Sequence, residues 1–205
     1  MSYSEVEICN LALSHVGIAQ GITSLESEST EAQQCNLHYE PTRDLLLRSF
    51  VWPFARKFRA LGLVTESDDE DTVTDWEDQW EFSYRYPSDC LRIIGFLVGN
   101  RRDPEKRPHE LGADDEGQLI YCDEEDARIA YVSKITDPQR FPDDFAHALA
   151  WKLAARLAMP LTGRSELRAQ AEAEFDKAMG EARVSALQEE QRDDEPDAEH
   201  IRARG

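Results

Sequence analysis

One segment limits the possible folds more than any other, because from Phe141 to Met159 the chain is apolar on almost every side of a helix. Its main polar residues are His147, Lys152 and Arg156. A helix that is apolar all round is buried all round, either at the centre of a domain or against a neighbouring subunit. Its longest apolar run, around Phe145 to Met159, is too short to span a bilayer and contains Lys152 and Arg156. We therefore expect a central helix in a protein that does not cross a membrane.

Another helix is predicted near the N-terminus. Ser4 to Glu7 form a capping box, because the Ser4 hydroxyl can accept from the amide three residues on while Glu7 reaches back. The helix should end near His15. Gly17 follows it and can take the left-handed conformation of a C-terminal cap.

A second capping box, Thr30 to Gln33, predicts the start of the next helix. Pro41 lies inside this helical pattern, and we expect it to kink the helix or split it in two. Trp52 precedes Pro53 and should end the helix, because the residue before proline disfavours helical geometry. The apolar stripe of this helix consists of Ala32, Cys35, Tyr39, Leu46 and Phe50.

A final helix is predicted from about Ser165 to Gln188, after Pro160 has stopped the central one. Its alanines allow close approach of another helix, and its stripe consists of Leu167, Ala171, Phe175, Ala178 and Ala182. The acidic tail beyond it contains Pro196, and we expect it to be disordered until bound.

The middle of the chain predicts strands. Alternation or apolar runs mark 80–84, 91–98, 118–122 and 127–132, and turns separate them. The predicted fold class is therefore α+β, mainly a helical bundle with a small inserted antiparallel β-sheet. We assign residues 1–62 and 137–190 to the helical core. Residues 63–136 form the inserted sheet region with acidic loops, and 191–205 form a flexible tail.

The charge is strongly negative, with 42 acidic and 23 basic residues and a net charge of -19. Such a surface repels phosphates, which excludes nucleic-acid binding by charge neutralisation. The simplest interpretation of the acidic segment from Glu66 to Glu81 is a solvated loop. A functional interpretation is a negative rim that keeps DNA away or contacts a basic partner, formed by Asp68, Asp69, Glu70, Asp71, Asp75, Glu77 and Asp78.

No pattern of catalytic, cofactor-binding or metal-ligating residues stands out. The five histidines are isolated, and the four cysteines form no C-x-x-C pair, so we interpret them as reduced core residues. Phosphate loops, dinucleotide fingerprints and nucleophile elbows are missing from the sequence. We therefore expect a protein that is not an enzyme and carries no cofactor or metal.

An aromatic and basic cluster follows the second predicted helix. One interpretation is a hinge packed under the sheet, and the other is a contact surface for a protein partner. The candidate partner-binding residues here are Trp52, Phe54, Arg56, Lys57 and Arg59. A second candidate set lies at the end of the final helix and in the tail: Leu187, Glu189, Glu190, Ile201 and Arg202.

Taken in order, short signatures along the chain resemble the tail tubular protein A-like family of head-to-tail adaptors from tailed bacteriophages. They cover about Ser4 to Ala186 and comprise Val6 to Gly17, Cys35, Tyr39, Arg43-Asp44, Trp52-x-Phe54-Ala55, Tyr86-Pro87-x-Asp89-Cys90-Leu91-Arg92, Ile129-Ala130-Tyr131, Ile135-Thr136-Asp137-Pro138, Phe141 and Ala148 to Gly163.

The resemblance implies a structural virion protein at the head–tail junction, made in the cytoplasm of the host bacterium. A dozen copies would form a ring between the portal and the next tail component, a nozzle or stopper. DNA would pass through the ring only as cargo, and no membrane would be involved. From the small-residue stripe of the final helix and the expected disorder of the tail, we expect these two segments to grip the portal.

Two other classes stay open. An acidic mimic of DNA that inhibits a DNA-binding host protein would explain the charge. A small packaging subunit that binds DNA is the third, and the charge argues against it.

Overall fold

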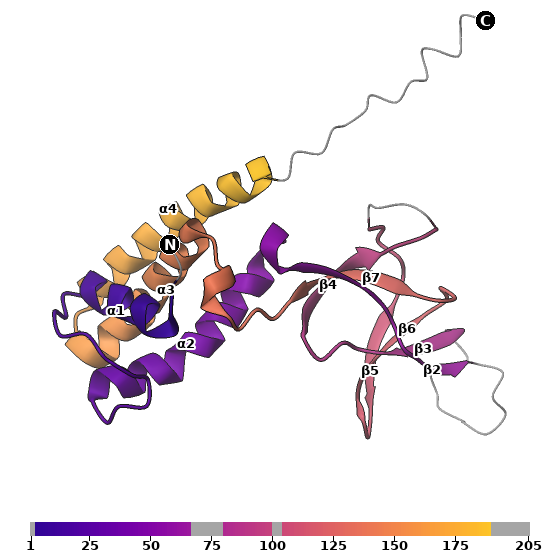
Figure 1. Cartoon of the computed structure of the whole chain (residues 1–205), viewed down its shortest axis with the longest axis horizontal. Helices are drawn as coiled ribbons and strands as arrows, with labels where there is room; N and C mark the ends of the chain where they lie inside the picture. The colour runs from indigo at the N-terminus through magenta and orange to yellow at the C-terminus, as the bar shows by residue number, and fades with distance from the viewer. Residues whose placement is uncertain (1–2, 67–79, 100–103, 190–205) are drawn as a thin grey trace, which may run out of the picture.

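The computed structural model describes residues 3–66, 80–99 and 104–189, and it has an α+β fold. Figure 1 shows the helices gathered at one end of the molecule and the strands at the other. The described helices are α1 (Glu5–His15), α2 (Thr30–Ser49), α3 (Asp143–Thr162) and α4 (Ser165–Glu189).

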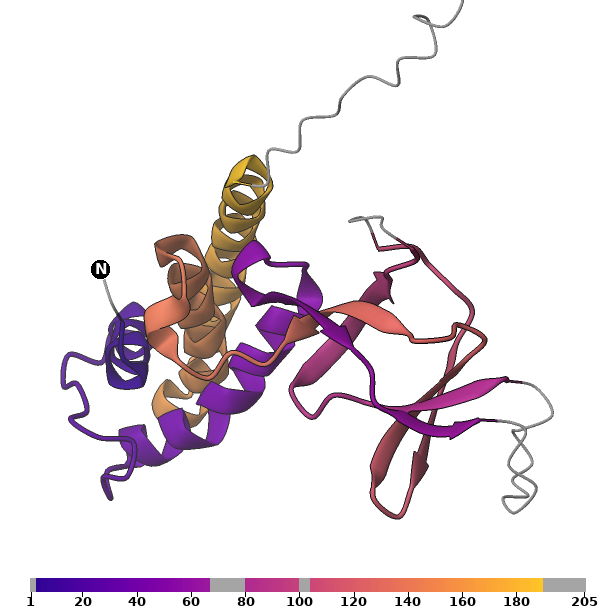
Figure 2. The ribbon, with the colours of Figure 1, turned by 45° about the vertical axis from the view of Figure 1, so that its right-hand side comes forward.

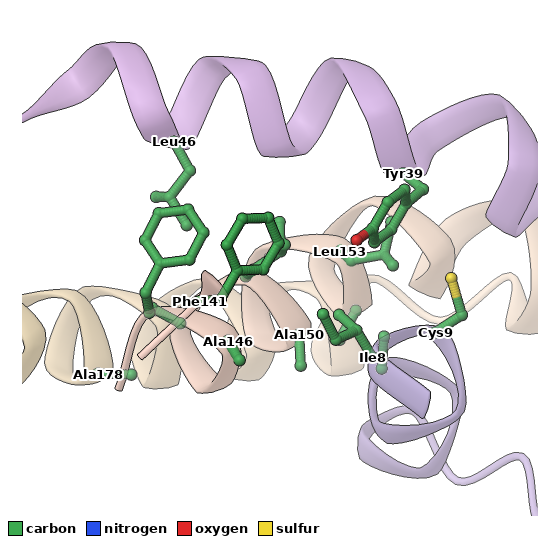
Figure 3. Close-up of a cluster of buried hydrophobic side chains, with 14 of the residues drawn as sticks. Ile8, Cys9, Tyr39, Leu46, Phe141, Ala146, Ala150, Leu153 and Ala178 are labelled. Atoms are coloured by element: carbon green, nitrogen blue, oxygen red, sulfur yellow. The ribbon is translucent and has the colours of Figure 1, made fainter. Parts of the chain in front are cut away.

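Helix α3 is the centre of the helical body, as its sequence predicts. It contacts α1, α2 and α4. Half of its 20 residues are buried, among them Phe145, Leu149 and Leu153. Figure 3 shows how side chains from α1, α2 and α4 meet those of α3 in this core. The apolar segment is therefore buried inside one chain, without a neighbouring subunit.

The start of α1 agrees with the prediction. The Ser4 hydroxyl accepts from the Glu7 amide at 3.2 Å, and the Glu7 carboxylate accepts from the Ser4 amide at 2.7 Å. Gly17 follows the helix with a φ of +80°, in the left-handed region that glycine tolerates. The loop beyond is held by Asn10, whose side-chain amide exchanges hydrogen bonds with the backbone of Ile22 at 2.7 and 3.0 Å.

Two details of α2 differ from the sequence prediction. Its N-cap is Ser29 rather than Thr30, and the Ser29 hydroxyl accepts from the Ala32 amide at 3.2 Å. Pro41 does not split the helix, which continues to Ser49. Proline frees the carbonyl four residues earlier, that of Leu37. Both Pro41 and Leu37 are exposed, so this freed carbonyl lies on the face open to solvent.

Helix α3 also passes through a proline that was expected to stop it. Pro160 lies in the last turn, and the helix continues to Thr162. Pro160 removes the amide that would bond to the carbonyl of Arg156. Pro160 is exposed and Arg156 is only half-buried, so this carbonyl lies on a side of the helix that water can reach. The end is set by Gly163, which has a φ of +67° and donates its amide to the carbonyl of Met159 at 3.0 Å. Helix α4 follows within the range that was predicted.

The strands form two antiparallel sheets, where the sequence predicted one. The first has the order β1-β7-β4, and the second has the order β2-β3-β6-β5. The strands are β1 (Arg56–Ala60), β2 (Leu63–Glu66), β3 (Phe82–Arg85), β4 (Cys90–Phe96), β5 (Glu110–Asp114), β6 (Gly117–Cys122) and β7 (Arg128–Ser133). A small core, which includes Tyr84, Phe96 and Ile129, lies between the two sheets.

Strands β1, β2 and β5 were not predicted. Strand β1 shows no alternation of apolar and polar residues, because Arg56, Lys57 and Arg59 make it mostly basic. Its backbone pairing with β7 holds it in the sheet. Residues 56–60 lie within the segment 1–62 that the sequence assigned to the helical core, and the structure places them in the first sheet. Pairing partners that are distant in sequence therefore decide these strands.

The chain enters the β region once, from α2 through a short 3-10 turn (Pro53–Ala55), and returns from β7 to α3 (Figure 2). The two paths touch where the Ser133 hydroxyl donates to the carbonyl of Ala55 at 2.9 Å. All four cysteines are free thiols, and Cys9, Cys35 and Cys122 are buried. Three of the four cysteines therefore lie in the core as predicted, and Cys90 is half-buried.

Candidate interaction surface

The outer face of α2 is apolar. Leu37 and Leu45 are 63% and 50% exposed, and Pro41 lies between them at the same spacing of four residues. Residues four apart share one face of a helix. The buried stripe of α2, which includes Cys35, Tyr39 and Leu46, lies on another face. Helix α2 therefore shows one apolar stripe to the core and a second one to solvent.

Helix α4 repeats this arrangement. Its buried residues are small, namely Ala171, Ala178, Ala182 and Ala186 with Met179, and they face α3. On another side, Val184 and Leu187 are 55% and 59% exposed. Gly180 lies one turn before Val184 and two turns before Leu187, and a Cβ atom added there would meet nothing within 4 Å. The second half of α4 thus has an open apolar side as well.

A groove connects the two helices. It has a volume of 310 Å³ and lies between α2 and α4, with Lys152 of α3 also in its lining. Leu45 and Leu46 line it from α2, and Phe175, Met179 and Gly180 line it from α4. Because Leu45 and Gly180 belong to the two exposed stripes, the stripes border one hollow. We call this region the α2–α4 face.

The groove carries positive charge. The Lys152 ammonium lies 4.5 Å from the centre of the Phe175 ring, and the Arg183 guanidinium lies 5.7 Å from the centre of the Phe50 ring. Among the ion pairs of the described residues, neither cation has a carboxylate partner within 4.0 Å. Asp176 is the only carboxylate among the described lining residues. This part of an acidic protein therefore favours an anionic partner with apolar side chains.

Of the candidate contact residues after α2, the aromatic ones serve mainly as packing. Trp52 is 2% exposed, and its indole N–H donates to the carbonyl of Leu46 at 3.1 Å. Phe54 is half-buried, with its ring 5.0 Å from that of Phe145. Neither side chain is free to act as the centre of a partner contact in this structure. The hinge interpretation of the aromatic cluster fits these two residues better.

The basic members of that cluster are engaged within the first sheet. Lys57 donates to Asp89 at 2.7 Å, and the other oxygen of Asp89 accepts from the Tyr131 hydroxyl at 3.0 Å. Arg56 lies 5.6 Å from the centre of the Phe58 ring. Arg59 is exposed. Burial and the hydrogen bond to Asp89 raise the pKa of Tyr131 to about 12.

The second candidate set is described only in part. Leu187 is on the open side of α4, and Glu189 is the last described residue of that helix. Glu190, Ile201 and Arg202 lie outside the described residues. So do all seven residues of the acidic rim: Asp68, Asp69, Glu70, Asp71, Asp75, Glu77 and Asp78.

Sequence reasoning missed Leu37, Leu45 and Val184 as surface residues. The available signal was their spacing. Leu37, Pro41 and Leu45 recur every four residues, out of phase with the buried stripe of the same helix. A helix with two apolar stripes needs two partners, and the described residues cover only one of the two stripes.

A wider cleft of 620 Å³ opens between the two sheets. Arg85 lines it, and its guanidinium donates to both carboxylate oxygens of Asp114 at 2.6 and 2.8 Å. This pairing lowers the pKa of Asp114 to about 2. Arg85 is therefore neutralised by Asp114 and Glu116, while Arg59, which also lines the cleft, is exposed.

The described residues contain no cluster of three or more His, Cys, Asp or Glu side chains that could hold a metal ion. None of the described helices is long and apolar enough to cross a membrane. No protein-family model matches this chain, and no curated protein matches its sequence.

Proposed function

We propose that this chain is a structural subunit of a head-to-tail adaptor ring in a tailed bacteriophage. The ring lies between the portal and the next tail component, a nozzle or stopper, and DNA passes through it. The observation that carries the proposal is the α2–α4 face, an exposed apolar surface on a chain whose own core is fully built. Such a surface marks a site of protein contact.

The arrangement of the face suits a ring. Copies in a closed ring meet through two different surfaces, one on each side of the subunit. The α2–α4 face joins residues of two helices, with Leu37 and Leu45 on one side and Val184 and Leu187 on the other. We assign this face to one side of the contact between neighbouring copies. The β region lies at the other end of the molecule, and we assign it to the next tail component (Figure 1).

The net charge of -19 supports the passage of DNA through the ring. A wall that repels phosphates displaces no counterions from the DNA and therefore does not bind it. The proposal includes no catalytic step and no cofactor. The end of α4, from Leu187 to Glu189, together with the segment that follows it, is proposed to contact the portal.

The experiment that tests the ring contact is charge substitution on the face. We expect Leu45→Glu and Val184→Glu to abolish assembly, because each places a carboxylate in an apolar contact. Leu111→Glu is the matched control, since Leu111 is 57% exposed on β5, away from the helices. Assembly is measured by native mass with the portal protein present. Equal assembly of all three variants would remove the α2–α4 face from the proposal.

Portal contact by the end of α4 has its own test. A chain truncated after Gln188 should lose portal binding and keep the circular dichroism spectrum of the full chain, because the described core lies before this point. Unchanged portal binding would assign the contact elsewhere.

A further inference from the structure

We propose that the groove of the α2–α4 face holds the chain's own C-terminal segment, residues 190–205, folded back along α4. This inference goes beyond the proposed function and does not depend on it. It rests on three properties: the chemistry of the groove, the composition of the segment, and the distance between them.

The groove needs an occupant with anionic and apolar groups. Leu45, Phe175 and Met179 give it apolar walls. Lys152 and Arg183 contribute two cations against the one carboxylate of Asp176. One turn further along α3, Arg156 adds positive charge and helps to lower the pKa of His38 on α2. Positive charge therefore extends from the groove along α3 to the side that faces α2.

The C-terminal segment has the complementary composition. Its 16 residues contain six acidic and three basic side chains, and the five acids from Asp193 to Glu199 occur without a basic residue between them. Ile201 follows and offers an apolar side chain for the groove walls. In a chain of net charge -19, most of the surface repels an acidic segment, whereas a cationic groove attracts it.

The segment begins within reach of the groove. Glu189 is six residues beyond Arg183, which is about 9 Å along a helix. Extended chain spans roughly 3.3 to 3.6 Å per residue. Fully extended, residues 193 and 199 therefore reach at most about 13 Å and about 35 Å from Glu189. Arg183 is within reach of this whole stretch. Lys152 is within reach of its later residues, because it lies against Phe175, about 21 Å before Glu189 along α4.

A tethered segment binds its own chain at high effective concentration, so weak contacts are enough to hold it. In this position it covers the apolar groove and lowers the tendency of isolated chains to associate. A partner that docks on the α2–α4 face must then displace it.

The test is carbodiimide cross-linking of the full chain, which joins a lysine amine directly to a neighbouring carboxylate. We expect Lys152 to be joined to acids between Asp193 and Glu199. Lys177 is the matched control, because it is exposed on α4, does not line the groove, and is also within reach of the segment. The expected yield at Lys152 is several-fold higher than at Lys177. Equal yields, or none at Lys152, would overturn the proposal.

Mixing unlabelled and 15N-labelled chains distinguishes a segment bound to its own chain from a segment bound to another copy. Cross-links within one isotope place the segment in its own groove, whereas mixed-isotope cross-links place it in another copy and contradict the inference. Arg183→Glu should lower the Lys152 yield several-fold, and Arg168→Glu, at an exposed site nearer the start of α4, should leave it unchanged. Circular dichroism verifies that both variants fold. An Arg183→Glu variant with full yield would also count against the proposal.

Discussion

Lys134, which directly follows β7, lies 3.1 Å from Asp44 of α2. The other oxygen of the same carboxylate accepts from Arg43 at 2.9 Å. Arg43 has no exposed side-chain area, and Tyr39 packs beside it. Asp44 therefore joins the exit of the β region to a buried cation in the helical core.

Substitution of Asp44 tests the importance of this link. In Asp44→Asn the buried guanidinium keeps only Glu40 and Glu5, at 3.5 and 4.0 Å. We expect the free energy of unfolding to fall by about 2 kcal/mol, the usual effect of leaving a buried charge poorly paired. Urea denaturation measures it. Glu172→Gln, which breaks an exposed pair with Arg168, is the control and should cost below about 0.5 kcal/mol. Equal losses would contradict a special role for Asp44.

Gly95 of β4 should not tolerate a side chain. A Cβ atom there would lie 2.6 Å from the backbone carbonyl oxygen of Glu105, which pairs with Phe96 beside it. Because backbone has to move, we expect Gly95→Ala to cost about 1 to 3 kcal/mol of unfolding free energy. At Gly62 an added Cβ atom meets nothing within 4 Å, so Gly62→Ala serves as the control. A thermal unfolding midpoint for Gly95→Ala as high as that of the control would refute the close approach.

The junction of α1 and α3 should make stability depend on pH. The His15 ring stacks on the Trp151 indole with centroids 3.6 Å apart, and Trp151 donates to His147 at 3.2 Å. Burial and the nearby His147 lower the pKa of His15, while Glu174 of α4 opposes them. A lowered pKa means that the unfolded chain binds the proton more tightly. The stabilisation by neutral His15 is therefore complete above the ordinary histidine pKa and is lost as the pH falls below it.

The measurement is the difference in unfolding free energy between the natural chain and His15→Phe, taken from pH 7.5 to pH 5. The natural chain should lose stability relative to the variant on acidification. Taking the difference removes the contribution of His38, whose pKa is also lowered, by burial and by Arg156. A difference that stays constant across this range would show that His15 does not titrate as described.

The purified chain should show no affinity for duplex DNA, even at low salt, because its net charge is -19. Fluorescence anisotropy with a labelled duplex measures this directly. Tight binding at low ionic strength that weakens steeply with salt would support the packaging-subunit alternative. Tight binding to a basic DNA-binding protein, in competition with DNA, would instead favour the DNA mimic.

The helices could largely be predicted because their signals are local. Ser4 and Gly17 are a start and a stop that need no tertiary information. The apolar content of residues 141–159 requires burial on every side of the helix, which contacts with α1, α2 and α4 provide. Pro41 and Pro160 misled the prediction for a physical reason. Their cost depends on whether the freed carbonyl faces solvent, and sequence alone does not show this.

The strands and the α2–α4 face depend on contacts between distant segments. Strand β1 is held by its pairing with β7, some 70 residues away in the chain. The sequence allows Trp52 to be a contact residue or a packing residue. Its hydrogen bond to the carbonyl of Leu46 is a tertiary feature that the sequence does not show. The groove exists only because α4 returns beside α2, so no local pattern could predict it.

Native mass measurement and particle imaging, on the purified chain alone and with its portal protein, test the central proposal most directly. We predict a closed ring of many copies, about twelve by the family resemblance, that forms either alone or on the portal. A monomer that stays unchanged in the presence of the portal would contradict the adaptor proposal.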